Sequence, residues 1–428
     1  MNGCNEFDAT IAATRIRRGE LTSEALVAAC LARIDAEERE VGAWQFLARE
    51  QALAQAREAD LHEARGALHG VPIAVKDVFD TFDMPTTLGS PIYTNRQPCW
   101  DAACVAAVRA AGAIVLGKTV TTEFASYHPG KTRNPHDRSR TPGGSSSGSA
   151  AAVADFMAPL AFGTQTAASV TRPAAFCGVI GYKATFGELS LSGVRPLAQS
   201  LDTLGMFARS VADAALLRAV LLGEDPSPLP ALATPPRLGL CRTPSWPLAE
   251  PAMREALEAA VRELRRAGAT IDEIELPEPF ALVNDAQQTV MTYEPARNYV
   301  FEMTQRPDGL SASFRAICEA GTRIDRATYL DARRRIAEAG RRLPDAMRDC
   351  DALITPATRG EAPPIEGGTG DPVMSRMWTA LGTPTLALPV PRTAGALPMA
   401  VQLVANRHTD PRLLAVGEWV AGALRRTV

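Results

Sequence analysis

Lysine is scarce in this chain. Only four of its 45 basic residues are lysines, Lys76, Lys118, Lys131 and Lys183, and all the others are arginines. Positive charge at the surface is therefore supplied by arginine, which stays protonated in proteins. A basic side chain that must lose its proton near neutral pH has to be a lysine here, so the four lysines are candidates for acid–base chemistry.

Other features are absent as well. The net charge of −3 provides no surplus of positive charge to attract nucleic acid or an anionic membrane. Apolar runs are interrupted by charge or proline, as Asp155 and Pro159 interrupt residues 150–163, so we expect no bilayer-spanning segment. The opening residues MNGCNEFDAT lack the blocks of a secretion signal, and the eight cysteines include no Cys-x-x-Cys pair. These absences favour a cytoplasmic protein with free thiols and no nucleic-acid or membrane partner.

The pattern of apolar residues predicts alternating strands and helices. The expected strands cover residues 71–75, 113–116, 238–241, 270–276, 352–355, 385–389 and 400–404, and helical spacing covers 6–36, 47–65, 101–112, 252–267, 326–341 and 411–423. This alternation predicts an α/β fold with a large mixed, mostly parallel β-sheet covered by helices on both faces. We interpret residues 1–428 as a single domain, in which the proline-rich segment 225–236 is either a surface crossing or a boundary.

One lysine stands at the end of an expected buried strand. The segment 71–75 (VPIAV) leads directly into Lys76. Burial disfavours the ammonium form, so a lysine in this position can become a neutral general base. The five histidines have no recognisable catalytic context. A structural lysine in an ion pair remains the alternative for Lys76, as for Lys118 and Lys183.

Two serine-containing loops follow further along the chain. Residues 143–149 (GGSSSGS) lead into an alanine-rich helical segment from residue 150, which argues against a flexible linker. Residues 163–169 (GTQTAAS) form a second turn. The first loop also matches Gly-x-Ser-x-Gly, which would make Ser146 a nucleophile. That alternative needs an acid and a histidine downstream. The only downstream histidine is His408, which lies near Asp410 without a supporting pattern.

Taken together, these segments resemble the amidase signature family. The resemblance rests on residues 70–77 (GVPIAVKD), 134–135 (NP), 143–149 and 163–169, in that order. Lys76 precedes Ser145 by 69 residues, and Ser145 precedes Ser169 by 24. The similarity covers a core of about residues 66–210, with weaker similarity in the remainder, including 383–384 and 397–403.

The resemblance implies a Ser–cis-Ser–Lys triad. Ser169 would be the nucleophile that forms an acyl-enzyme, Ser145, preceded by a cis peptide bond, would relay the proton, and Lys76 would be the base. The oxyanion hole would consist of the backbone N–H groups of Thr166, Ala167, Ala168 and Ser169. The expected reaction is hydrolysis of a small carboxylic amide, or an amide-like urea or ester, by water. No metal or cofactor is implied.

The turn before Ser169 departs from the family pattern. Gln165 replaces the usual aspartate, and Ala167 and Ala168 replace glycines. Alanine strains the backbone where φ is positive, and its methyl group narrows a close approach. A restricted acyl pocket and weakened catalysis are the two expectations. The aspartate-to-glutamine change is expected to be tolerated, because this side chain has no direct role in the triad.

Substrate identity and partners stay open at this level. A glutaminase or amidotransferase-type subunit, and a catalytically weakened member with a binding role, are the alternatives to a stand-alone amidase. The length, without room for a large appended domain, favours the stand-alone enzyme. A homodimer is compatible with the sequence. The variable pocket region is expected at about residues 280–380. Its aromatic residues either line the pocket or belong to the core; they are Tyr293, Tyr299, Phe301, Phe314, Tyr329 and Trp378. Its arginines either bind a substrate carboxylate or form a solvated helix face; they are Arg323, Arg326 and Arg333–Arg335.

Overall fold

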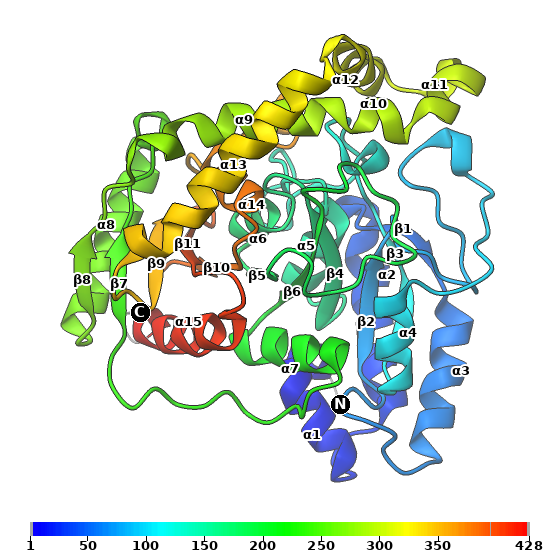
Figure 1. Cartoon of the computed structure of the whole chain (residues 1–428). Helices are drawn as coiled ribbons and strands as arrows, with labels where there is room; N and C mark the ends of the chain where they lie inside the picture. Colours follow the sequence, from blue (N-terminus) through cyan, green and yellow to red (C-terminus); the bar gives the residue numbers. More distant parts are fainter. Residues whose placement is uncertain (1–2, 394, 426–428) are drawn as a thin grey trace.

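The computed structural model describes residues 3–393 and 395–425 (Figure 1). Its strands are β1 (Trp44–Leu47), β2 (Pro72–Lys76), β3 (Ile114–Thr119), β4 (Leu160–Gln165), β5 (Ile180–Lys183), β6 (Thr203–Ala208), β7 (Arg237–Leu240), β8 (Thr270–Glu273), β9 (Ala352–Pro356), β10 (Thr385–Pro389) and β11 (Ala400–Val404). The helices are α1 (Ala9–Arg17), α2 (Ser23–Val41), α3 (Arg49–Asp60), α4 (Ala103–Ala110), α5 (Ser147–Ala154), α6 (Thr171–Cys177), α7 (Val211–Leu222), α8 (Pro251–Arg266), α9 (Val283–Tyr293), α10 (Pro295–Asn298), α11 (Val300–Gln305), α12 (Ala312–Arg323), α13 (Arg326–Met347), α14 (Val373–Ala380) and α15 (Asp410–Arg425).

These strands form one mixed sheet in the order β1-β3-β2-β4-β6-β5-β10-β11-β9-β7-β8. The predicted α/β class and the large mixed sheet are confirmed. Parallel pairing is less extensive than expected, because it joins only β3, β2 and β4 on one side and β9, β7 and β8 on the other. In the centre, β6 inserts antiparallel between β4 and β5, and β11 inserts antiparallel between β10 and β9.

The two faces of the sheet contribute to two different hydrophobic cores. Side chains alternate between the faces of a strand. In β2, Ile73 and Val75 accordingly join a core that includes residues of α4, α7, α8 and α15, whereas Ala74 joins a core built by α2, α5 and α6. In β10, Leu386 and Leu388 belong to the first core and Ala387 to the second. Helices therefore cover both faces, as predicted.

Three central strands, β4, β5 and β6, were not among the strands predicted from the sequence. All their residues are buried, so they lack the alternation of polar and apolar residues that marks a half-exposed strand. Residues 163–165, expected in a turn, complete β4 instead. The helical spacing predicted over residues 6–36 corresponds to α1 and the first part of α2, and α2 begins after Thr22, whose side chain accepts from the Ala25 N–H.

The proline-rich segment 225–236 runs over the surface from α7 to β7 (Figure 1). Strands before and after this segment belong to the same sheet. The single-domain assignment itself stays a prediction, and the ends of its 1–428 span lie outside the described residues. Within the described ranges, no helix has the length and apolar character needed to cross a membrane.

Candidate active site

Lys76 is the last residue of β2 and is completely buried, with 0% of its surface exposed. Its ammonium nitrogen donates to Ser145 Oγ at 2.8 Å and to Thr164 Oγ1 at 2.7 Å. Burial lowers the pKa of Lys76 to about 7, although the nearby Asp202 charge acts in the opposite direction. A large fraction of Lys76 is therefore neutral near neutral pH and able to accept a proton.

The other lysines have different surroundings. Lys118 is buried and lies 3.3 Å from the Asp77 carboxylate. Lys183 is also buried, and its pKa is lowered to about 7 by burial, but it donates to the backbone carbonyls of Ala184 and Thr383. Lys131 lies at the surface, 3.7 Å from Glu38. Of the four lysines, Lys76 is the one whose side-chain nitrogen donates to a serine hydroxyl.

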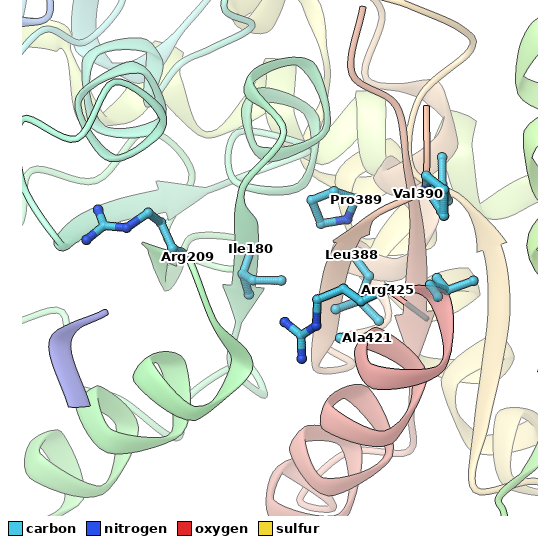
Figure 2. Close-up of a pocket in the computed structure, with 9 residues that line it drawn as sticks. Ile180, Arg209, Leu388, Pro389, Val390, Ala421 and Arg425 are labelled. Atoms are coloured by element: carbon cyan, nitrogen blue, oxygen red, sulfur yellow. The ribbon is translucent and has the colours of Figure 1, made fainter. Parts of the chain in front are cut away.

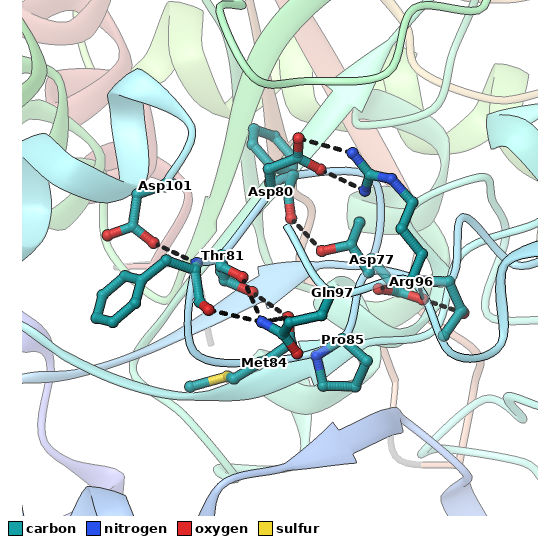
Figure 3. Close-up of polar contacts among 12 residues, drawn as sticks. Asp77, Asp80, Thr81, Met84, Pro85, Arg96, Gln97 and Asp101 are labelled. Atoms are coloured by element: carbon teal, nitrogen blue, oxygen red, sulfur yellow. Dashed lines mark hydrogen bonds and ion pairs between the residues drawn. The ribbon is translucent and has the colours of Figure 1, made fainter. Parts of the chain in front are cut away.

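The segment after Lys76 is held by a polar network (Figure 3). Asp77 accepts from the Thr87 N–H at 3.0 Å and pairs with Lys118. Arg96 makes a two-point contact with Asp80, at 2.6 and 2.9 Å. The carboxyl end of β2 is thereby fixed, and so is the position of the Lys76 side chain.

Ser145 precedes helix α5 in the glycine- and serine-rich loop. The Gly144–Ser145 peptide bond is cis. The buried Arg172 donates to the Gly144 carbonyl oxygen at 2.7 Å, and the Thr122 N–H donates to the Ser145 carbonyl oxygen at 3.2 Å. The carbonyl group of the cis peptide and the carbonyl group of Ser145 are thus each held by a partner from another part of the chain. These contacts fix the position of Ser145, whose Oγ accepts from Lys76.

Ser169 lies in the turn between β4 and α6 and is 7% exposed. Because β4 pairs in parallel with β2, the carboxyl ends of the two strands lie at the same side of the sheet. The turn after β4 therefore begins on the same side as Lys76, the last residue of β2. Within residues 3–393 and 395–425, nothing bonds the Ser169 hydroxyl or the N–H groups of Ala167, Ala168 and Ser169. The turn therefore presents free donors and a free hydroxyl. The structure brings Lys76 and Ser145 into contact, and the catalytic roles of all three residues stay predictions.

The alanines of this turn do not strain the backbone. Neither Ala167 nor Ala168 is among the described non-glycine residues with positive φ. The expected strain is therefore absent, because the turn does not place alanine in the left-handed region that favours glycine. Whether the methyl groups narrow the acyl pocket stays a prediction.

Several buried polar residues around the turn make contacts that sequence reasoning did not anticipate. Gln165 Oε1 accepts from the Val170 and Thr171 N–H groups, and so ties the turn across its base. Thr164, which the sequence marks only as part of a motif, is the second acceptor of Lys76. Gln287 and Thr379 bond carbonyl groups of the turn, and they lie far away in the sequence with no local motif that could have marked them.

Asp202 is the acidic group of this region. It is buried, accepts from Thr166 Oγ1 at 2.5 Å and from the N–H groups of Leu197 and Ala198, and has a pKa raised by burial to about 7. Asp202 and Thr164 also line a cavity of about 190 Å³ beside the Lys76 site. The titratable neighbour of Lys76 is thus a carboxyl group that also anchors the first residue of the turn.

The alternative site built on Ser146 is not assembled. The Ser146 hydroxyl bonds the backbone carbonyl of Thr164 at 3.3 Å. Asp410 bonds Tyr182 and Thr185, and His408 is exposed. Within the described ranges, neither His408 nor Asp410 contacts Ser146.

Other cavities lie away from these residues. One of about 270 Å³ opens between β5, β10 and the end of α15 (Figure 2), and its lining includes none of the candidate catalytic residues. In the expected pocket region, Tyr299, Phe314 and Trp378 are core side chains, whereas Phe301 is 56% exposed. Arg334 and Arg335 pair with Asp331 on an exposed helix face. Three of the aromatic residues are thus core side chains, and two of the arginines lie on a solvated helix face. That this region contains the substrate pocket stays a prediction.

Comparison with known proteins gives one consistent result. A family model described as Amidase matches residues 25–414. A glutamyl-tRNA(Gln) amidotransferase subunit from Chloroflexus aggregans is 35% identical, over 95% of this chain and 94% of its own length. A crystal structure of an amidase aligns with a TM-score of 0.89 and 32% identity, over 98% of this chain and 100% of that chain. The peptide amidase of Stenotrophomonas maltophilia aligns with a TM-score of 0.83 and 31% identity, over 98% and 97% of the two chains. On this breadth of similarity, the chain belongs to the amidase family.

Proposed function

We propose that this protein cleaves the C–N bond of a carboxamide through an acyl-enzyme on Ser169. The observation that carries the proposal is the buried contact between Lys76 and Ser145, in which a lysine with a pKa near 7 donates to a serine hydroxyl. A base of this pKa operates efficiently at neutral pH. Membership of the amidase family and the similarity to solved amidases support the same reaction class.

The reaction uses these residues in two half-reactions. Ser169 Oγ attacks the amide carbonyl carbon while its proton passes through Ser145 to Lys76. The N–H groups of the turn stabilise the oxyanion, Lys76 returns the proton to the leaving nitrogen, and the C–N bond breaks. Water then attacks the acyl-enzyme, gives a proton to the same relay, and releases the carboxylic acid and free Ser169.

A second candidate is a glutaminase subunit that passes ammonia to a partner. The similarity to the amidotransferase subunit of Chloroflexus aggregans favours it, and this chain covers 94% of that protein. The length of the chain therefore does not separate a stand-alone amidase from such a subunit, contrary to the expectation from sequence. Both candidates share the Ser169 chemistry and differ in the amide and in the fate of the ammonia.

Ammonia release from a panel of amides distinguishes the two candidates. The panel contains aliphatic and aromatic primary amides, a peptide amide and glutamine, each incubated with the purified chain. We expect release from primary amides by the chain alone. Turnover confined to glutamine and increased by a copurifying protein would identify the second candidate. A folded protein that releases no ammonia under either condition would contradict the second candidate and would exclude primary amides as substrates of the first.

The pH dependence of the reaction tests the base. Because Lys76 must be neutral and its pKa is about 7, we expect kcat/KM to rise about tenfold per pH unit below that value and to level off above it. The Asp202 charge raises the pKa of Lys76, so Asp202→Asn should move the rising limb to lower pH. The rise of kcat/KM with pH should be unchanged in His408→Ala. A flat profile from about pH 5 to 9 would exclude a titrating base.

A further inference from the structure

Two carbonyl groups of the turn that leads to Ser169 are held by side chains from distant helices. The Thr166 carbonyl oxygen accepts from Gln287 Nε2 at 2.9 Å, and the Ala167 carbonyl oxygen accepts from Thr379 Oγ1 at 2.6 Å. Gln287 lies on α9 and Thr379 on α14, and both side chains are buried. The turn is therefore fastened to the part of the chain that follows the amidase motifs.

The geometry of the peptide group converts these contacts into an orientation of N–H groups. In a planar trans peptide the C=O and N–H bonds point in opposite directions. The bond that holds the Thr166 carbonyl thus aims the Ala167 N–H away from α9, and the bond that holds the Ala167 carbonyl aims the Ala168 N–H away from α14. Both N–H groups lack an acceptor in the described part of the chain. Buried N–H groups without a partner are rare in native proteins, so these two are available to a bound oxyanion.

Gln165 donates a hydrogen bond to the Thr379 hydroxyl oxygen and so helps to hold this side chain on the turn. Its Oε1 is occupied by the N–H groups of Val170 and Thr171, so its Nε2 faces Thr379 Oγ1 and donates to it at 3.0 Å. The Thr379 hydroxyl has two carbonyl acceptors within reach, Ala167 at 2.6 Å and Ser375 of its own helix at 3.2 Å, and the shorter bond favours Ala167. An aspartate at this position, as in the family pattern, offers no N–H donor. The glutamine is thus matched to Thr379.

We propose that Gln287 and Thr379 are positioning residues that orient the Ala167 and Ala168 N–H groups of the oxyanion hole, with Gln165 holding the Thr379 side chain in place. This inference rests on the proposed function, because it assigns a role in stabilising an oxyanion formed at Ser169. It also gives α9 and α14 a role in catalysis that is separate from lining a substrate pocket.

The test measures how fast a fluorophosphonate labels Ser169. In this reaction Ser169 Oγ bonds phosphorus, fluoride leaves, the serine proton passes to Lys76, and the phosphoryl oxygen occupies the oxyanion hole. The variants are Thr379→Val and Gln287→Met, which keep the side-chain size and remove the donor. Matched controls are Thr383→Val, a buried threonine that bonds the Trp378 carbonyl, and Gln288→Met, the adjacent glutamine on α9. Intact-protein mass follows the labelling rate of each protein.

Removal of one oxyanion-hole donor lowers rates about 10²- to 10³-fold. An N–H group that stays in place but is less well oriented should lower the labelling rate by a smaller factor. We therefore expect Thr379→Val and Gln287→Met each to slow labelling by about 10- to 100-fold, with an unchanged midpoint of the pH–rate profile because Lys76 is untouched. Thr379→Ser should restore the rate, and both controls should label at the wild-type rate.

Labelling of both variants at the wild-type rate, or an equal slowing in the controls, would overturn this inference and leave the proposed function intact. A shifted pH midpoint in Thr379→Val or Gln287→Met would also overturn it, by showing an effect on Lys76. Failure of the wild type to label would overturn the proposed function and this inference together. Failure of this inference is therefore seen in the variants and controls, and failure of the proposed function is seen in the wild type.

Discussion

Replacement of Lys76 with methionine is expected to lower kcat/KM by about 10⁴-fold or more, as the loss of a catalytic base does in serine hydrolases. Methionine fills most of the volume of the lysine stem and removes the amine. Ser145 Oγ and Thr164 Oγ1 would lose their shared partner, at 2.8 and 2.7 Å in the native chain. The relay from Ser169 would then have no group to receive the proton. In free energy the loss corresponds to roughly 5.5 kcal/mol of transition-state stabilisation.

Lys183→Met is the matched control for this substitution. Lys183 is equally buried, and burial lowers its pKa to about 7 as well, but its nitrogen bonds two backbone carbonyls and no serine. Its loss leaves those carbonyls without a donor, so we expect a stability cost of about 1–3 kcal/mol and an unchanged kcat. Steady-state kinetics and thermal unfolding of both variants separate the effects. Equal loss of kcat in the two variants would mean that burial of a lysine, and not the Ser145 contact, accounts for the effect.

Replacement of Ser169 with alanine is expected to abolish both amide hydrolysis and fluorophosphonate labelling. The substitution removes one oxygen, and that hydroxyl makes no hydrogen bond within the described residues, so no buried partner is left unsatisfied. Folding stability should therefore be nearly unchanged. The acyl-enzyme cannot form without the oxygen, and the fall in kcat should reach about 10⁴-fold or more. Intact-protein mass should show one adduct on the wild type and none on the variant.

Ser147→Ala is the control for a non-specific reaction of serine. Ser147 is also buried, at the start of α5, where its hydroxyl makes a long bond of 3.4 Å to the Val120 carbonyl. This variant should keep the adduct and the activity. An adduct that persists in Ser169→Ala would contradict the assignment. If it then disappears in Ser146→Ala, the Gly-x-Ser-x-Gly alternative would be correct.

Several features of the site could be predicted from local sequence. The apolar segment 71–75 predicted a buried strand that ends at Lys76, and β2 has this form. The run into residues 150–154 predicted a helix, and α5 covers these residues but begins earlier, at Ser147 within the serine loop. Such predictions succeed because apolar patterning and helix or turn preferences are encoded within a few residues. The same reasoning missed β4, β5 and β6, since uniformly buried strands carry no alternating pattern.

The sequence by itself determined the order and spacing of the motifs, the scarcity of lysine and the family they indicate. Only the tertiary structure decided which lysine meets a serine, because Lys76, Lys118 and Lys183 are all buried and differ only in their neighbours. It also decided that Gln287 and Thr379 hold a turn 121 and 212 residues away from them. Contacts over such distances depend on the order of strands in the sheet and on how helices pack against it, and no local run of residues encodes either.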